Sequence, residues 1–277
     1  MNEHVKIAAV QMASGPNVDA NLMEASQLIE SATRQGARIV VLPENFSYMG
    51  PSTGDALEKV ERDGDGPVQE FLANQAKKHG IMLVGGTVPL MARDPSKVRA
   101  ACLVYDAEGK RLARYDKMHL FDVNLIDVDE TYQESKYIER GEEVVVLDAP
   151  CGRVGVAVCY DVRFPELFRA MLDKGAELLV LPAAFTALTG KAHWETLIRC
   201  RAIENLCYVV AAAQGGYHIS GRETYGHSMI VDPWGVVLGC LPRGPGVVIA
   251  EADRTRLENT RRNFPCLEHR TLRCVLP

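Results

Sequence analysis

The sequence predicts an α/β protein in which helices cover two related β-sheets that pack face to face. Short apolar runs rich in valine, typical of buried strands, alternate along the chain with amphipathic helical patterns. One strand-helix-strand pattern also occurs twice, since residues 36–44 (GARIVVLPE) resemble residues 175–183 (GAELLVLPA) and each copy follows a predicted helix. Chance similarity between short units is the alternative explanation. We expect two halves of similar topology, with strand ends that meet at one edge.

The first half alternates strands and helices as far as the hairpin at residues 106–109. Its predicted strands are residues 5–11, 39–42, 81–84, 101–105 and 112–115, and its predicted helices are residues 21–35 and 68–78. Gly36 and Gly80 follow the two helices, at positions where glycine commonly ends a helix. Residues 116–141 show neither period, and long irregular segments inside compact domains are often functional.

The second half repeats this alternation. Its predicted strands are residues 144–147, 154–158, 178–181, 208–213, 227–231, 236–239 and 247–252, and its predicted helices begin at Pro165 and at about residue 192. A chain of 277 residues suits one large α/β domain. We therefore interpret residues 1–277 as a single domain, in which residues 263–277 form a C-terminal extension without periodicity.

Composition excludes several classes of function. Hydrophobic residues make up 47% and charged residues 24% of the chain, as in ordinary globular proteins. The net charge of -5, without a lysine or arginine run, gives no reason to expect nucleic acid or a membrane as partner. The first residues resemble no secretion signal, and eight cysteines without a C-x-x-C pair suggest reduced thiols rather than a zinc site. We expect a cytoplasmic protein with a small-molecule or protein partner.

Cys159 lies between the strand at residues 154–158 and the helix that begins at Pro165. A rigid turn of this kind presents a cysteine close to backbone N–H groups that could stabilise a thiolate and later an oxyanion. The alternative is that Cys159 is a small buried hydrophobic residue, as most free cysteines are. The position therefore makes Cys159 a candidate nucleophile.

Two ionisable residues follow other predicted strands. Glu44 comes directly after the strand at residues 39–42, where burial tends to raise the pKa of a carboxyl group toward values useful for a general base. Lys117 comes just after the strand at residues 112–115. Each could be a solvated surface residue. A glutamate, a lysine and a cysteine at three strand ends are more informative together than singly.

These residues resemble the signature regions of the nitrilase superfamily of carbon-nitrogen hydrolases. The resemblance is carried by Leu42-Pro-Glu44, Tyr115-Asp-Lys117-Met-His-Leu120 and Cys159-Tyr-Asp-Val-Arg163-Phe-Pro-Glu166, and it extends from Val5 to at least Arg254. It implies a four-layer α-β-β-α sandwich with pseudo-two-fold halves. It also implies a homodimer or higher homo-oligomer, usually formed through the helical face near the nucleophile.

The resemblance also implies roles for individual residues. Glu44, Lys117 and Cys159 would form a catalytic triad, and Glu134 resembles a second glutamate that positions the lysine and the base, although Glu130 is close by. The positions that would line the substrate site are Tyr160, Arg163, Phe185 and Thr189. The implied chemistry requires no metal and no organic cofactor.

The residues after the cysteine separate the subgroups of this superfamily. Nitrilases usually carry tryptophan and glutamate there, whereas this chain has Tyr160 and Asp161, which favours an amidase. Residues 215–221 (GGYHISG) are most similar to bacterial-type deaminated glutathione amidases. The implied reaction converts a terminal carboxamide to carboxylate and ammonia through a cysteine thioester, with deaminated glutathione as the favoured substrate. The alternatives are omega-amidase activity on 2-oxoglutaramate or 2-oxosuccinamate, and N-carbamoyl amidohydrolase activity.

Two further hypotheses compete with this one. A papain-like cysteine and histidine pair would need His119, His193 or His227 beside Cys159, although each of these is more simply a structural histidine. A non-catalytic scaffold could keep the fold for protein contacts, but the presence of all three triad residue types argues against it.

Overall fold

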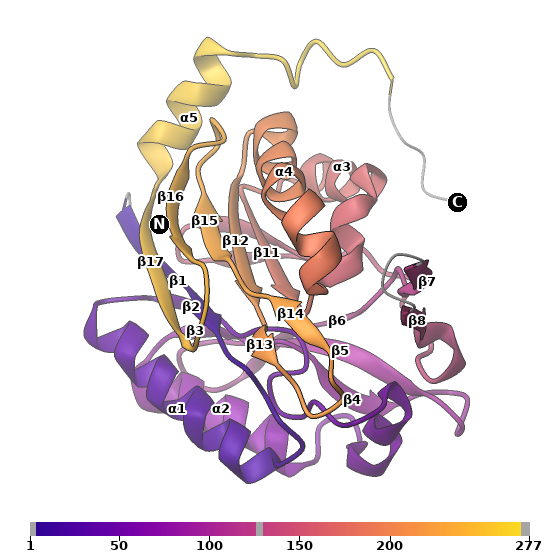
Figure 1. The fold of residues 1–277 in the computed structure, drawn as a ribbon. Helices are drawn as coiled ribbons and strands as arrows, with labels where there is room; N and C mark the ends of the chain where they lie inside the picture. Colours follow the sequence, from indigo (N-terminus) through magenta and orange to yellow (C-terminus); the bar gives the residue numbers. More distant parts are fainter. Residues whose placement is uncertain (1–3, 126–129, 273–277) are drawn as a thin grey trace.

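The computed structural model describes residues 4–125 and 130–272, which fold into a layered α/β sandwich (Figure 1). Seven strands form the first sheet, in the spatial order β17 (Gly246–Asp253), β1 (His4–Gln11), β2 (Ile39–Val41), β3 (Met82–Val84), β5 (Val98–Tyr105) and β4 (Val88–Met91), with β6 (Arg111–Asp116) paired to β5. Six strands form the second sheet, in the order β16 (Val237–Leu241), β15 (Ser228–Val231), β12 (Tyr208–Ala213), β11 (Leu178–Ala183), β10 (Gly152–Val156) and β9 (Val146–Ala149).

The two sheets have the same topology. In the first sheet β1, β2 and β3 are parallel to one another, and the antiparallel strands β17 and β5 flank them. In the second sheet β10, β11 and β12 are parallel, and the antiparallel strands β9 and β15 flank them. The sequence repeat therefore reflects two structurally equivalent halves, and the predicted α-β-β-α sandwich is confirmed.

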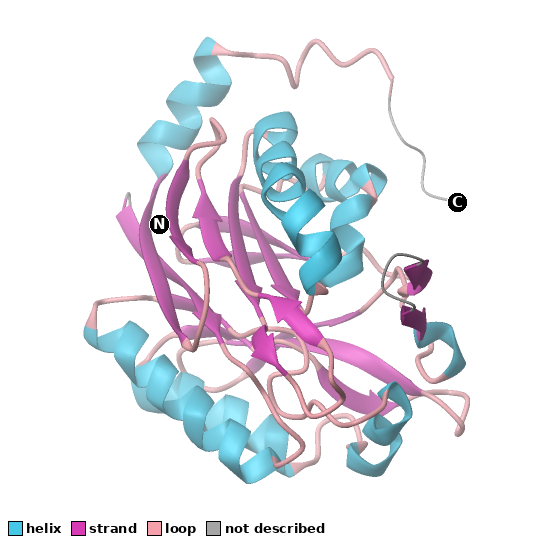
Figure 2. Cartoon of the chain, in the orientation of Figure 1, coloured by secondary structure: helices cyan, strands magenta, loops and turns pink. Residues whose placement is uncertain are grey.

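Helices cover the outer face of each sheet (Figure 2). The first sheet carries α1 (Val18–Arg34) and α2 (Pro67–His79), and the second carries α3 (Pro165–Asp173) and α4 (Ala187–Asn205). Strand β1 shows how alternation builds these layers, because Ile7 and Ala9 pack into the core between the sheets, whereas Ala8 and Val10 pack against the helical layer that includes Ile29. Burial of a side chain as large as those of Ile7 and Val10 contributes roughly 1.5–3 kcal/mol.

Helix α4 is longer than the sequence pattern suggested. It begins at Ala187 rather than near residue 192, because the Thr186 hydroxyl accepts a hydrogen bond from the Thr189 backbone N–H at 3.3 Å and so caps the first turn. Gly190 lies in that turn, where a Cβ atom would come 2.3 Å from the side chain of Tyr225. The early start therefore brings α4 against a neighbouring strand.

Several short elements carry no clear sequence signal. The irregular segment at residues 116–141 contains the antiparallel pair β7 (Asp122–Leu125) and β8 (Glu130–Gln133). A second small pair, β13 (Gly215–Tyr217) and β14 (Glu223–Tyr225), precedes β15. The described residues also contain the 3-10 helices η1 (Thr53–Lys59), η3 (Glu134–Lys136) and η4 (Cys159–Arg163).

The chain ends with helix α5 (Arg254–Asn263) and a segment without regular structure. Residues 264–272 lead back toward the α3 and α4 layer (Figure 1), where Arg270 forms an ion pair with Asp173 at 2.9 Å. Residues 273–277 of the predicted extension lie outside the described residues. In the part of the chain that the structure describes, no helix is long and apolar enough to cross a membrane.

Candidate active site

Glu44, Lys117 and Cys159 meet at one edge of the sandwich, where the strands that precede them end. The Lys117 Nζ donates to Glu44 Oε1 at 2.8 Å and to the two Glu134 oxygens at 2.9 and 2.8 Å. Lys117 is 1% exposed and Glu44 is 4% exposed. The partner of Lys117 is thus Glu134, and the side chain of Glu130 lies outside the described residues.

Cys159 begins the 3-10 helix η4 in an unusual backbone conformation. Its φ of +50° is in the left-handed region, which costs a non-glycine residue about 1–3 kcal/mol. This conformation turns the chain sharply after β10 and leaves the side chain 7% exposed. The backbone at Ala184 lies close enough to the Cys159 sulfur to lower the pKa of the thiol, an effect that burial outweighs. The predicted strand-turn-helix around this residue is therefore present, with η4 inserted before α3.

Burial and charge together set the resting protonation of the site. Burial, then the Glu44 carboxylate, raises the pKa of the Cys159 thiol well above its usual value, and the Lys117 charge opposes this only in part. Burial disfavours the Lys117 ammonium, but the Glu134 and Glu44 carboxylates outweigh burial and raise its pKa. One ammonium is thus shared by two carboxylates, beside a neutral thiol whose pKa the Glu44 carboxylate helps to raise.

Asp161 joins the cysteine turn to the lysine segment. Its side chain is fully buried and accepts hydrogen bonds from the Tyr115 hydroxyl at 2.6 Å and from the Val158 backbone N–H at 2.8 Å. It also accepts from the His119 backbone N–H at 3.0 Å and contacts the His119 ring at 2.7 Å. Tyr115 and His119 flank Lys117 in sequence, so one carboxylate fixes two of the three strand ends relative to each other.

A similar set of contacts fixes the turn that carries Glu44. The Gln214 side chain donates to the Glu44 carbonyl at 3.0 Å and to the Ser14 hydroxyl at 2.8 Å. Gly86 packs directly against this turn, where a Cβ atom would lie 2.1 Å from the Pro43 carbonyl. The backbone of Glu44 is therefore held by segments from both halves of the chain.

A small inner cavity of about 20 Å³ lies over Cys159. The four substrate-binding residues proposed from the sequence, Tyr160, Arg163, Phe185 and Thr189, all line it together with Glu44 and Glu134. The Arg163 guanidinium lies 5.1 Å from the Phe185 ring centroid and 5.7 Å from that of Tyr160. Burial lowers the pKa of Arg163. This partly desolvated cation lines the same cavity as the candidate nucleophile Cys159, where an anionic group could bind.

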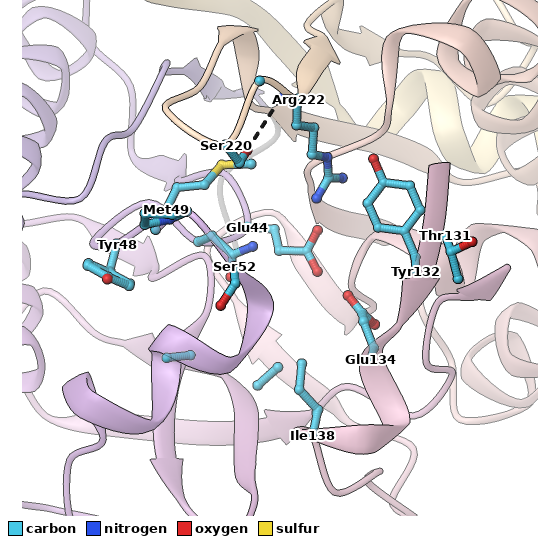
Figure 3. Close-up of a pocket in the computed structure, with 16 residues that line it drawn as sticks. Glu44, Tyr48, Met49, Ser52, Thr131, Tyr132, Glu134, Ile138, Ser220 and Arg222 are labelled. Carbon is cyan, nitrogen blue, oxygen red and sulfur yellow. Dashed lines mark hydrogen bonds between the residues drawn. The ribbon is translucent and has the colours of Figure 1, made fainter. Parts of the chain in front are cut away.

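An outer chamber of about 520 Å³ adjoins the inner cavity (Figure 3). Glu44, Asn45, Glu134 and Arg222 line both spaces and mark the boundary between them. The other residues around the chamber come from loops, from η1 and from strands β5 and β8, and they include Tyr48, Met49, Ser52, Thr131, Tyr132, Ile138 and Ser220. The volume lies in the range of small-molecule sites.

The histidines do not form the alternative pair with Cys159. The His119 ring contacts Asp161 and stacks on Phe164 with ring centroids 3.7 Å apart. His193 contacts Arg163 at 3.3 Å, and the His227 ring contacts the Tyr225 carbonyl at 2.9 Å. None of the three is among the residues that line the two cavities.

Sequence reasoning did not assign roles to Asp161 and Arg222. Asp161 is two residues from the candidate nucleophile, and only its contacts with the lysine segment show what it does. Arg222 follows Gly221 in the loop between β13 and β14, and its sequence neighbourhood gives no sign that it reaches the cavities. Among residues 4–125 and 130–272, no group of three or more histidine, cysteine or acidic side chains is arranged to hold a metal ion.

The chain is similar in sequence and in fold to known carbon-nitrogen hydrolases. The carbon-nitrogen hydrolase family matches residues 6–262. A Synechocystis protein named deaminated glutathione amidase is 44% identical over 95% of this chain and 97% of its own length. A Yersinia enterocolitica protein of the same name is 39% identical over 96% of this chain and 93% of its own. The crystal structure of Saccharomyces cerevisiae Nit3, a member of branch 10 of the nitrilase superfamily, has a TM-score of 0.88 at 32% identity and covers 98% of both chains.

Proposed function

The chain belongs to the carbon-nitrogen hydrolase family, and from this premise we propose that it is an amidase for deaminated glutathione with Cys159 as its nucleophile. That it hydrolyses amides follows from the family and from its named relatives. The observation that carries the catalytic proposal is the arrangement of one lysine ammonium between two carboxylates beside a buried thiol. The substrate proposal rests on the names of the relatives and on the size of the outer chamber.

The first chemical step forms a thioester. The Glu44 carboxylate takes the proton from the Cys159 thiol as the sulfur attacks the amide carbon, so that no free thiolate has to accumulate. Collapse of the tetrahedral intermediate breaks the carbon-nitrogen bond, and Glu44 returns the proton to the departing amine. A water molecule activated by the same carboxylate then attacks the thioester, which frees the carboxylic acid and restores the thiol.

The Lys117 ammonium stabilises the negative oxygen of the intermediate, together with a backbone N–H near Tyr160. In the resting site its hydrogen bonds go to Glu44 and Glu134. When Glu44 accepts the thiol proton it loses its negative charge, and its attraction for Lys117 weakens. The proton transfer therefore releases an N–H of Lys117 at the moment when the oxyanion forms.

The leaving group distinguishes the candidate substrates. The terminal carboxamide and the release of ammonia expected from the sequence do not apply to deaminated glutathione, because it carries its amides as peptide bonds. Cleavage next to its oxoacyl group releases a dipeptide amine. The omega-amidase substrate 2-oxoglutaramate has a terminal carboxamide and releases ammonia. Both reactions yield 2-oxoglutarate. An outer chamber of about 520 Å³ has room for a dipeptide leaving group, which favours the larger substrate.

The direct test is to incubate the purified enzyme with each substrate and measure 2-oxoglutarate. We expect a higher kcat/KM for deaminated glutathione, loss of turnover in Cys159→Ala, and full turnover in Cys240→Ala, which removes an exposed cysteine of β16. Unchanged turnover in Cys159→Ala would refute the assigned nucleophile. Faster hydrolysis of 2-oxoglutaramate would favour the omega-amidase alternative, and no turnover of any amide tested would favour a scaffold.

We also propose that the enzyme is a cytoplasmic homodimer that pairs through its α3 and α4 layer. The exposed apolar residues Leu188 and Ile203 of α4 support this surface. The seven cysteines of the described chain are all free thiols, which suits a reducing compartment. Sedimentation of the wild-type enzyme and of Ile203→Asp tests the dimer, since the variant should be monomeric.

A further inference from the structure

We propose that Arg222 selects substrates whose leaving amine carries a carboxylate, which it binds at the boundary between the inner cavity and the outer chamber. This inference rests on the proposed amidase function and specifies the substrate class for that site. The leaving amine of deaminated glutathione belongs to this class, because its dipeptide ends in a carboxylate.

Arg222 lies where the inner cavity meets the outer chamber. It lines the inner cavity together with Cys159 and also lines the outer chamber. In Figure 3 its side chain extends into the chamber, as do those of Glu44 and Glu134. The guanidinium lies 5.1 Å from the ring centroid of Tyr132, which holds its plane in a defined orientation. An amine that departs from the acyl carbon on Cys159 toward the outer chamber would pass this cation.

The hydrogen bonding of Arg222 is the second argument. One terminal nitrogen donates to the Ala184 carbonyl, but the Nε atom is buried and has no hydrogen-bond partner. Arg222 also forms no ion pair with any residue in the described parts of the chain. Buried donors are nearly always satisfied, and a guanidinium presents a fork of donors that matches a carboxylate. The protein therefore satisfies the guanidinium only in part and supplies no carboxylate to it, which leaves its other terminal nitrogen for an anionic ligand group.

The charge of the chamber is the third argument. Among the described residues that line the chamber, Arg222 is the cation, and Glu44 and Glu134 are the acidic residues. Both glutamates already bind Lys117. The deeper cation Arg163 stands beside Cys159 and suits the carboxylate of the oxoacyl part. Arg222 is thus the group available to a second, more distant carboxylate, which the two glutamates would otherwise repel.

The test compares deaminated glutathione with its C-terminal carboxamide, which differs from it only by the distant charge. The wild-type enzyme should prefer the acid by about 10- to 100-fold in kcat/KM, the range expected for a hydrogen-bonded charge pair. Arg222→Gln should lose this preference, mainly through KM for the acid, and Arg222→Lys should keep part of it. Arg243→Gln removes an exposed arginine from the turn between β16 and β17 and should keep the wild-type preference.

Other outcomes would overturn the inference. An equal loss of kcat on both substrates in Arg222→Gln would mean that Arg222 only positions Ala184. If wild type and Arg222→Gln prefer the acid over the carboxamide to the same extent, another residue binds the distant carboxylate. If the wild-type enzyme hydrolyses neither substrate, the proposed function itself fails. Hydrolysis of both without any preference overturns the role of Arg222 alone.

Discussion

The pairing of Lys117 with Glu134 makes Glu134→Gln the most informative single substitution. Glutamine keeps the shape of the side chain but replaces the carboxylate, whose two oxygens contact the Lys117 Nζ at 2.9 and 2.8 Å. The one amide oxygen of the variant would also be needed by the Phe121 backbone N–H, which donates to Glu134 at 2.8 Å. Lys117 would therefore keep Glu44 as its sole carboxylate partner.

The contacts set the expected size of the effect. A hydrogen bond between charged groups is worth about 1.5–3 kcal/mol. If this loss loosens Lys117 in the transition state, kcat should fall by roughly 10- to 150-fold. The pKa of Lys117 should also fall, because burial disfavours the ammonium and one of the two carboxylates that outweigh burial is gone. Since the ammonium is then lost at a lower pH, the alkaline limb of the kcat/KM profile should move to lower pH.

The assay is the release of 2-oxoglutarate between neutral and alkaline pH, with melting temperatures measured in parallel. Glu142→Gln is the matched control, because Glu142 is an exposed glutamate that, like Glu134, lies between β8 and β9. A Glu134→Gln variant with wild-type kcat and an unshifted alkaline limb would refute the role of Glu134 in holding Lys117. A lower melting temperature with an unchanged pH profile would show that Glu134 acts on stability alone.

Two further predictions concern the groups around Cys159. Asp161→Asn should lower the free energy of unfolding by about 3 kcal/mol or more, because the buried carboxylate accepts bonds from Tyr115 and Val158. Thermal melting against Asp148→Asn, whose side chain is 94% exposed, checks this, and equal melting temperatures would contradict it. Alkylation of Cys159 by iodoacetamide should be slow at neutral pH and faster in Glu44→Gln, because removal of the Glu44 charge lowers the raised pKa of the thiol. Peptide mass spectrometry measures the rate, and slower labelling of the variant would oppose the assigned electrostatics.

The sequence predicted the fold where periodicity was strong. Most strands of both sheets and the order of the halves follow from apolar runs and from the repeat of GARIVVLPE in GAELLVLPA, whereas strand β4, which contains Pro89, was not predicted. Helix α5 escaped prediction because Leu257 is its one buried residue, so no apolar stripe marks it. The pairs β7 with β8 and β13 with β14 are only three or four residues long, and such segments carry too few side chains to show alternation.

The candidate site likewise combines local features that the sequence reveals with long-range contacts that it does not. By itself the sequence determined that Glu44, Lys117 and Cys159 follow buried strands, because a strand end is a local feature that a short apolar run reveals. The family resemblance already suggested that Glu134 holds the lysine, and the structure shows the contact between them. Only the tertiary structure decided that Asp161 ties two strand ends together and that Arg222 reaches both cavities. These contacts join segments far apart in the chain through loops, and loop conformation depends on packing against the rest of the fold rather than on local pattern.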